Sequence, residues 1–471
     1  MFSVRVVPVV ALIGVLIEDR HSLRFSTMTV SRTICIGFLA LIVVGTLLLM
    51  LPFSLASGEW NSPLTALFTS TSAVCVTGLI VVDTGTYFST FGQVVVLALI
   101  QLGGLGYMSA TTLLLLLIGR RLGLKDRLAI QQAMETAELA NVKVLLISII
   151  SMTLILELTG AFLLMPTFLE DFGLGRSLWL SVFHSISAFN NAGFSLFEDS
   201  LVRYAESGLP IAVISALIIL GGIGYQVIME AFIWVRERLR RSQVRSVFSL
   251  HFKIVTSTTL ALLVLGTVAF LLIEFDNPAT LAGKNLIGKT LMAGFQSVVM
   301  RTAGFNSIDI GAMEESSLFM AIALMFIGAS PGSTGGGIKT TTARIMLVCT
   351  YAALRGKQEV NCYQRQIPLL RVLKALSVVV ASALTVIIAT TCISISDPNL
   401  PFLNILFEAV SAFATVGLST GITAELSTLG QVFIVCTMYI GRVGILILMS
   451  AIIGDPSPSA IHYPEEDLLT G

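Results

Sequence analysis

The sequence has little charge and no grouped metal ligands. Only 12% of its 471 residues are Asp, Glu, Lys or Arg, about half the share that is usual in soluble proteins. The six cysteines are scattered without a C-x-x-C pair, and the histidines are not paired either. Metal clusters and a disulfide framework are therefore unsupported. Paired carboxylates and a nucleophile beside a base are also lacking, so we do not expect an enzyme.

Apolar residues dominate instead, at 55% of the chain, with a mean hydropathy of +0.91. A membrane helix needs about 20 mostly apolar residues. The sequence predicts an all-α polytopic membrane protein with eight transmembrane spans. These are expected at residues 33–53, 91–118, 143–165, 210–234, 251–273, 316–354, 369–394 and 427–453.

A short motif occurs four times. Each copy begins with Phe and ends with Gly, at 68–78, 183–193, 295–304 and 407–417. The terminal glycines are separated by 115, 111 and 113 residues, and such a regular period indicates repeated structural units. One copy lies between the two spans of each pair, so each unit reads as helix, short pore helix, turn, helix.

We therefore expect four pseudo-repeats around one central pore. The predicted units are a cytoplasmic N-terminal segment (1–32), repeat 1 (33–118), repeat 2 (119–234), repeat 3 (235–354), repeat 4 (355–453) and a cytoplasmic C-terminal tail (454–471).

The turn that ends each copy is the predicted ion-binding filter. Glycine permits the backbone dihedral angles that turn carbonyl groups toward an axis, where they can replace the hydration shell of a cation. The preceding short helices would also point their partially negative C-termini at the cavity. The predicted filter residues are Val76, Thr77 and Gly78; Asn191, Ala192 and Gly193; Thr302, Ala303 and Gly304; and Thr415, Val416 and Gly417. The last three match the start of the potassium-channel filter. The alternative is that these are merely packing glycines, which are common in membrane helices.

A glycine-rich stretch at 328–340 interrupts the sixth predicted span and cannot remain helical. It resembles a phosphate-binding loop, but one extra residue before Lys339 and the lack of a preceding strand argue against that function. The other second helices also contain small residues at this depth, but only the third is expected to be fully unwound. We expect the loop to lie across the axis below the filter.

Arg442 lies in the middle of the last predicted span. An arginine at that depth costs about 2.5–3.5 kcal/mol, so it should face a cavity or a partner. Carbonyl groups of the loop and the hydroxyl groups of Ser333 and Thr334 are suitable acceptors; the alternative is an extended side chain that reaches the cytoplasmic edge. Arg301 is expected behind the third turn, bonded to carbonyl groups or paired with an acid. For Glu157 an interfacial position is expected, and for Glu408 the start of the fourth pore helix.

Lys and Arg follow the second, fourth and sixth spans, whereas the opposite loops hold only Arg176, Arg203, Lys284 and Lys289. By the positive-inside rule both termini are cytoplasmic, and the motif turns open outward. We expect a multi-pass protein of the cell (inner) membrane in contact with lipid, with no nucleic-acid partner. Residues 4–17 are apolar but short. They form either an interfacial segment or a stretch that precedes a true start at Met28.

From about residue 28 the chain resembles the Trk/Ktr/HKT superfamily of potassium transporters, and it is most similar to the eight-span bacterial Ktr membrane subunit. The resemblance rests on the stretch from Arg301 to Phe305, on the glycine-rich loop and on Arg442. It implies potassium uptake through a pore with fourfold pseudosymmetry, with potassium at the filter residues and no covalently bound cofactor. In plant relatives a serine at the first filter glycine accompanies sodium transport, so Gly78 favours potassium.

The resemblance also implies a gate and partners. The gate would comprise Gly332, Ser333, Thr334, Gly335, Gly336, Gly337, Lys339 and Arg442. A homodimer of the chain would sit on a cytosolic ring of nucleotide-binding RCK-type subunits, and sodium would be an activator or co-ion in a sodium-dependent system.

Two alternatives remain. One is a sodium or mixed monovalent-cation transporter of the same superfamily. The other is a secondary transporter with alternating access, for which inverted repeats and paired broken helices would be expected. The common order of the four units and the single expected break argue against the second alternative.

Overall fold

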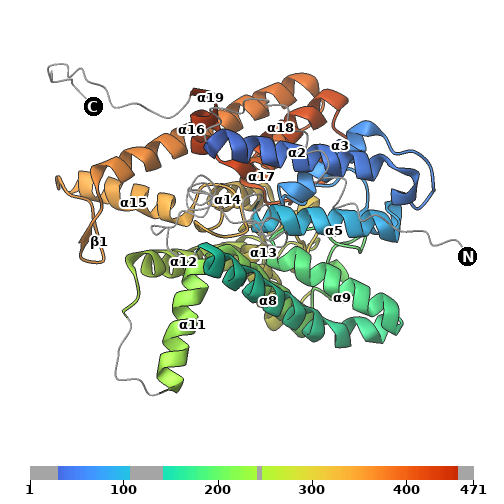
Figure 1. Cartoon of the computed structure of the whole chain (residues 1–471), viewed down its shortest axis with the longest axis horizontal. Helices are drawn as coiled ribbons and strands as arrows, with labels where there is room; N and C mark the ends of the chain where they lie inside the picture. Colours follow the sequence, from blue (N-terminus) through green and yellow to red (C-terminus); the bar gives the residue numbers. More distant parts are fainter. Residues whose placement is uncertain (1–29, 107–141, 241–246, 454–471) are drawn as a thin grey trace, which may run out of the picture.

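The computed structural model describes residues 30–106, 142–240 and 247–453, which are mainly helical (Figure 1). The first half contains α2 (Val30–Met50), α3 (Pro63–Val74), α4 (Thr84–Tyr87), α5 (Thr90–Leu105), α8 (Val142–Asp171), α9 (Leu174–Phe189), α10 (Gly208–Ile223) and α11 (Tyr225–Leu239). The second half contains α12 (Leu250–Ile273), α13 (Leu286–Val299), α14 (Glu315–Phe326), α15 (Thr340–Leu354), α16 (Leu369–Ser396), α17 (Phe402–Ala414), α18 (Thr428–Val443) and α19 (Ile445–Ile453).

Short elements complete the described part of the chain. Four 3₁₀ turns occur there: η1 (Pro52–Ser54), η2 (Val202–Tyr204), η3 (Ile310–Ala312) and η4 (Ile422–Ala424). A small hairpin between α15 and α16 pairs β1 (Asn361–Cys362) with β2 (Arg365–Gln366) in antiparallel register, Asn361 opposite Gln366 and Cys362 opposite Arg365.

The same three-helix arrangement occurs four times. A long first helix (α2, α8, α12 or α16) packs against a short helix (α3, α9, α13 or α17), and a second helix (α5, α10, α14 or α18) follows. The phenylalanine that opens each sequence motif lies in the short helix and is at most 2% exposed. The core is therefore built on the four short helices.

Contacts between these units form a closed cycle. The second helix of each unit packs against the short helix of the next: α5 against α9, α10 against α13, α14 against α17, and α18 back against α3. In Figure 1 the four coloured quarters of the chain accordingly surround a common centre.

Glycines make the close approach within each unit possible. A methyl group added at Gly45, Gly160 or Gly266 of the first helix would lie 2.3 or 2.4 Å from a serine hydroxyl of the short helix. The same serines donate to first-helix carbonyl groups: Ser70 to Ile42, Ser185 to Glu157 and Ser297 to Leu263, at 2.6–2.8 Å. These matching bonds define equivalent positions in the first three units.

Four described helices are long and apolar enough to cross a membrane, namely α2, α8, α12 and α16, and the number rises to six if each bent pair counts as one span. The bent pairs are α10–α11 and α18–α19. The second predicted span continues past α5 into residues 107–118, which lie outside the described residues. The sixth consists of α14 and α15 on either side of the loop at 327–339.

The expectation that only the third unit has a broken second helix is wrong. The chain bends by 106° between α10 and α11 and by 93° between α18 and α19. The breaks fall at Gly224 and Gly444, with φ of 89° and 85°, which a residue with a side chain rarely adopts. A helix cannot continue through such a residue, so the predicted spans 210–234 and 427–453 are not straight.

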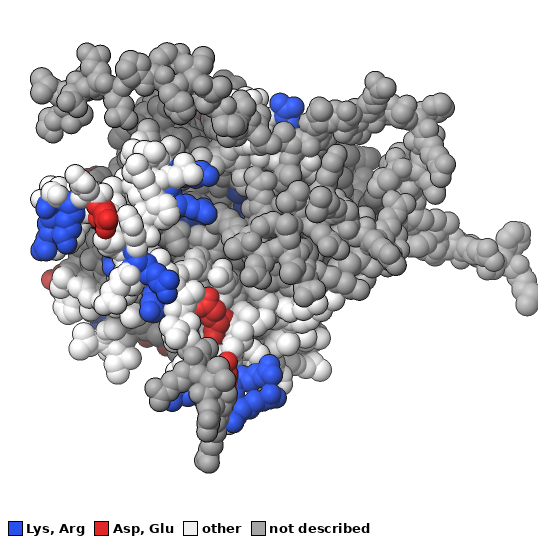
Figure 2. Space-filling view, turned by 60° about the vertical axis from the view of Figure 1, so that its left-hand side comes forward, with Lys and Arg blue, Asp and Glu red and all other residues white. Residues whose placement is uncertain are grey.

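Basic residues gather on one side of the molecule. Figure 2 brings forward α11, α15 and the hairpin, and Lys and Arg side chains are prominent on this face. The exposed basic residues of these segments and of the adjoining start of α16 are Arg236, Arg238, Arg240, Arg355, Lys357, Arg365, Arg371 and Lys374. The predicted orientation also rests on basic residues after the second and fourth spans that lie outside the described residues, namely Arg120, Arg121, Lys125, Arg127, Arg241 and Arg245.

Candidate functional site

The four predicted filter segments are brought together in space. We name them turn 1 (76–78), turn 2 (191–193), turn 3 (302–304) and turn 4 (415–417). Their terminal glycines, Gly78, Gly193, Gly304 and Gly417, all have positive φ, between 71° and 92°. The residue two positions earlier also has positive φ, between 51° and 68°, although it is Val, Asn or Thr. Such strain in β-branched residues persists only where the surrounding structure enforces it, and it clusters at functional sites.

The glycines contact one another in a ring. A methyl group added at Gly78 would lie 2.4 Å from the Ala192 oxygen, and one at Gly193 would lie 2.8 Å from the Ala303 oxygen. At Gly304 it would meet the Val416 oxygen at 2.6 Å, and at Gly417 the Thr77 oxygen at 2.1 Å. Each glycine therefore faces the carbonyl group of the next turn, and turn 4 closes onto turn 1.

A serine side chain of the short helix supports the turn in the first, second and fourth units. Gly78 and Gly417 donate their amides to Ser72 and Ser411, at 3.0 and 3.1 Å. Ser187, the equivalent residue of the second unit, donates to the Phe194 carbonyl at 2.8 Å. The third motif is one residue shorter, and the residue at this position is Val299, which has no hydroxyl group. The four turns therefore have similar backbone conformations, but the side-chain hydrogen bonds that stabilise them differ.

The glycine-rich loop (residues 327–339) lies directly against turns 3 and 4. The amide of Gly336 donates to the Thr415 hydroxyl at 3.1 Å. A methyl group added at Gly335 would lie 2.1 Å from the Thr302 hydroxyl oxygen. On the side of the second unit, the Thr334 hydroxyl donates to the Phe189 carbonyl at 3.2 Å. Glycine is needed here because the loop and the turns are in contact.

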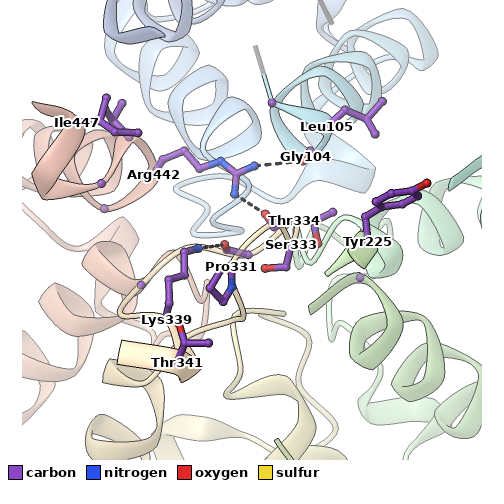
Figure 3. A pocket seen from close by; sticks show the side chains of 18 of the residues that line it. Gly104, Leu105, Tyr225, Pro331, Ser333, Thr334, Lys339, Thr341, Arg442 and Ile447 are labelled. Atoms are coloured by element: carbon purple, nitrogen blue, oxygen red, sulfur yellow. Dashed lines mark hydrogen bonds between the residues drawn. The ribbon is translucent and has the colours of Figure 1, made fainter. Parts of the chain in front are cut away.

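The other side of the loop lines a cavity of about 360 Å³. Its walls include α2 at Ile34, α8 at Met152, Tyr225 at the start of α11, and α16 at Ser382. Pro331, Ser333 and Thr334 project from the loop beside Tyr225, as Figure 3 shows. The lining contains none of the twelve turn residues, so the loop separates the turns from the cavity.

Arg442 ties the loop to the first unit. Its guanidinium donates to the carbonyl of Gly103. It also donates to the carbonyl of Thr334 in the loop and to that of Gly104, the latter at 3.4 Å, as Figure 3 shows. The expected loop carbonyl is thus an acceptor, but the expected Ser333 and Thr334 hydroxyls are not; they donate to the carbonyls of Ser330 and Phe189 instead. The side chain thus lies against the loop and the end of α5 and does not extend away from them.

Several other charged residues also have definite positions. The ammonium of Lys339 donates to the Gly335 carbonyl at 2.8 Å, within the loop itself. Arg301 is 7% exposed and donates to the Gly328 carbonyl at 3.2 Å. Of the two partners predicted for it, a carbonyl group or an acid, it therefore has the carbonyl group.

Glu408 was expected at the start of its helix, but it lies in the middle of α17, because that helix begins at Phe402. Its carboxylate accepts from the Thr423 hydroxyl. Glu157, expected near an interface, lies in the middle of α8 and is 3% exposed. It contacts Gln101 and Asn190, and no feature of the local sequence indicated this cluster.

Comparisons with known proteins agree with this arrangement. Residues 8–463 match the model of the cation transport protein family TrkH. The chain is 39% identical to "Ktr system potassium uptake protein B" of Bacillus subtilis, over 95% of this chain and 98% of that one. It is 38% identical to the protein of the same name from Vibrio alginolyticus, over 93% and 94% of the two chains.

Further similarity extends to a solved structure. The chain is 36% identical to "Potassium/sodium uptake protein NtpJ" of Enterococcus hirae, over 93% of this chain and 97% of that one. The crystal structure of the potassium transporter TrkH from Vibrio parahaemolyticus matches with a TM-score of 0.73 at 16% identity, covering 94% of this chain and 88% of that one. At this identity the match shows the fold. The chain is a multi-pass membrane protein and belongs to the TrkH/Ktr family of cation transport proteins.

Proposed function

We propose that the chain takes up potassium through a pore whose selectivity filter is the ring of turns 1 to 4. The single observation that carries the proposal is the closed contact of the four glycines, each against the carbonyl of the next turn. Rings of backbone carbonyl groups replace the hydration shell of potassium in known filters. Relatives at 38–39% identity are named potassium uptake proteins. The eight spans belong to this proposal, with one pair of spans for each turn.

The glycine-rich loop and Arg442 form the proposed gate. The loop contacts turns 3 and 4 on one side and the cavity on the other. An ion leaving the ring toward the cavity would have to displace it. Arg442 holds the loop at Thr334 and adds a positive charge beside the same route. Lys339 stabilises the loop from within through Gly335.

The proposed partners follow from the basic face. The exposed Lys and Arg of α11 and of the segment between α15 and α16 would lie on the cytoplasmic side by the positive-inside rule. We propose that a homodimer of this chain docks there on a ring of nucleotide-binding RCK-type subunits, in the cell (inner) membrane with both termini cytoplasmic. Sodium acts as an activator or co-ion in this proposal.

A second candidate is mixed transport of potassium and sodium, because a 36% identical relative is named a potassium/sodium uptake protein. A secondary transporter with alternating access has less support than either of these two functions. The single-break argument against it no longer holds, but the glycine breaks recur at matching places of units with the same helix order, whereas inverted halves would be expected.

The test is rubidium flux into vesicles that contain the purified chain, with potassium and sodium as competitors. We expect potassium to compete strongly and sodium weakly. Equal competition would favour the mixed transporter, and the absence of any potassium-inhibited flux, with and without the regulatory subunit, would overturn the proposal.

A further inference from the structure

A buried carboxyl group lies behind turn 2. Glu157 is in the middle of the long helix α8 and is 3% exposed. One of its oxygens accepts from the Asn190 amide at 2.9 Å, and the other accepts from the Gln101 amide at 3.3 Å. The described residues place neither Lys nor Arg in an ion pair with it. A carboxyl group in the membrane interior is costly and usually has a function.

Equivalent positions in two other units show what Glu157 does not do. Ile42 and Leu263 occupy its place, because their carbonyl groups accept the same serine hydrogen bond from the short helix. Both residues are apolar, so the packing of first helix on short helix needs no carboxyl group. The carboxyl of Glu157 therefore has a task that is specific to the second unit.

That task concerns Asn190, which ends α9 and immediately precedes turn 2. Its side-chain nitrogen has three oxygen acceptors at 2.9 Å: the Glu157 carboxyl, the Gln101 amide oxygen and the Ile186 carbonyl. Cys75, Arg301 and Ala414 precede the other turns, and no carboxyl group contacts any of them among the described hydrogen bonds. Among the described residues, turn 2 thus differs from the other turns: the residue before it is bonded to a carboxyl group of another helix.

The Asn190 side chain is also confined on its other side. Its oxygen lies against α5, where a methyl group added at Gly104 would meet it at 1.9 Å. Gly104 in turn accepts from Arg442 at 3.4 Å. Asn190 is therefore held between Glu157, Gln101 and the helix end that contacts Arg442, and a displacement of Asn190 would be passed to Asn191 and the rest of turn 2.

We propose that Glu157 is a positioning residue that sets ion specificity. Acting through Asn190, it holds turn 2 at the distance from the other turns at which the ring favours potassium over sodium. The inference rests on the proposed function, since it assigns a role within that ring. Specificity is a difference between two affinities, so a small displacement of one quarter of the ring alters the ratio before it abolishes flux.

The experiment compares two substitutions of Glu157 in the full-length chain. Rubidium flux into vesicles is measured with potassium and sodium as competitors, and the ratio of their inhibition constants is the readout. For Glu157→Leu we expect the preference for potassium to fall about tenfold, because Asn190 loses its anchor. For Glu157→Gln we expect a smaller fall, of about threefold, because the amide oxygen can still accept from Asn190 whereas the amide nitrogen can no longer accept from Gln101.

Matched controls come from the equivalent positions. Ile42→Leu and Leu263→Ile alter the same site in units without a carboxyl and should leave the ratio unchanged. Gln101→Met removes one partner of the cluster and should lower the ratio about threefold; it decides the matter if Glu157→Leu does not fold.

Failure of the proposed function and failure of the role of Glu157 would give different results. A wild-type chain without potassium-inhibited flux would overturn the proposed function. A wild-type chain with normal preference, together with folded Glu157→Leu or Gln101→Met variants that keep that preference, would overturn only the role of Glu157.

Discussion

The ring of turns and the layer of chain next to it differ in symmetry. In the ring, all four units adopt the same pair of positive φ angles and make the same contact with the next glycine. In the adjacent layer, the second and fourth units break at a single glycine, whereas the third inserts a loop and the fourth contributes Arg442. An ion in the ring needs similar ligands on all sides, but a gate needs only one movable element. The comparison therefore supports the proposal that the symmetric layer sets selectivity and that the asymmetric layer controls flux.

The largest expected effect comes from breaking the symmetric layer. Gly304→Ala or Gly78→Ala would place a methyl group 2.6 or 2.4 Å from a carbonyl oxygen of the neighbouring turn, at a positive φ. We expect potassium uptake to fall at least about a hundredfold, because the ring cannot close. The measurement is growth at low potassium of a bacterium without its own uptake systems, with membrane insertion checked in parallel.

Gly421→Ala is the matched control for these substitutions. Gly421 also has a positive φ, of 100°, but has open space around it. Normal growth is expected. Normal growth of the Gly304→Ala strain would refute the filter assignment.

The next largest effect should follow removal of the asymmetric element. Deleting residues 332–337 leaves the paired base of the loop, where Ile327 lies opposite Ile338, so the flanking helices can stay in place. We expect flux to rise about tenfold and to become independent of the regulatory subunit. The preference for potassium over sodium should be retained, because the ring is untouched. A folded deletion variant with lower flux would mean that the loop is a structural brace.

A weaker effect is expected when the loop is only released. Arg442→Ala removes the hydrogen bonds to Thr334, Gly103 and Gly104. Flux without the regulatory subunit should rise about threefold, because the loop is freed but still present. Tyr439→Phe serves as the control, since this residue lies one turn earlier in α18 and bonds to the Cys35 carbonyl instead of the loop. Equal flux in the Arg442→Ala and Tyr439→Phe variants would show that Arg442 has no role in the gate.

The smallest effect concerns the hydrogen bond between turn 4 and the glycine-rich loop. Thr415→Val keeps the shape of the side chain but removes the acceptor for the Gly336 amide. We expect the closed state to leak about twofold more, as one hydrogen bond of ordinary strength is lost. Thr415→Ser keeps the hydroxyl group and should retain the closed state. Leak currents at the same protein density are the measurement, and identical values for valine and serine would exclude this coupling.

Part of this architecture could be predicted from the sequence because it repeats. Four copies at a regular spacing identified the glycines of the turns, and local glycine content identified the interruption at 328–340. The breaks at Gly224 and Gly444 could not be predicted, because each lies three residues after a glycine that serves only for packing. Gly221 and Gly441 sit against the Phe189 and Phe413 carbonyls, and both kinds of glycine look alike in an apolar run.

The contacts of Glu157 also could not be predicted from the sequence. Its partners lie 56 residues before it and 33 residues after it, on helices whose facing sides depend on the closed packing of neighbouring units. A lone carboxyl in an apolar stretch indicates a function in general, but only the packing shows that Asn190 is the residue that it holds.

The order of contact around the ring, from turn 1 through turns 2 and 3 to turn 4 and back, occurs within one polypeptide. In an assembly of four identical subunits, one altered codon would change every quarter of the ring at once. Here one altered codon changes one quarter. Mutation and selection can therefore alter the ring one turn at a time. They can also place a carboxyl group or an arginine behind one turn without placing it behind the other three.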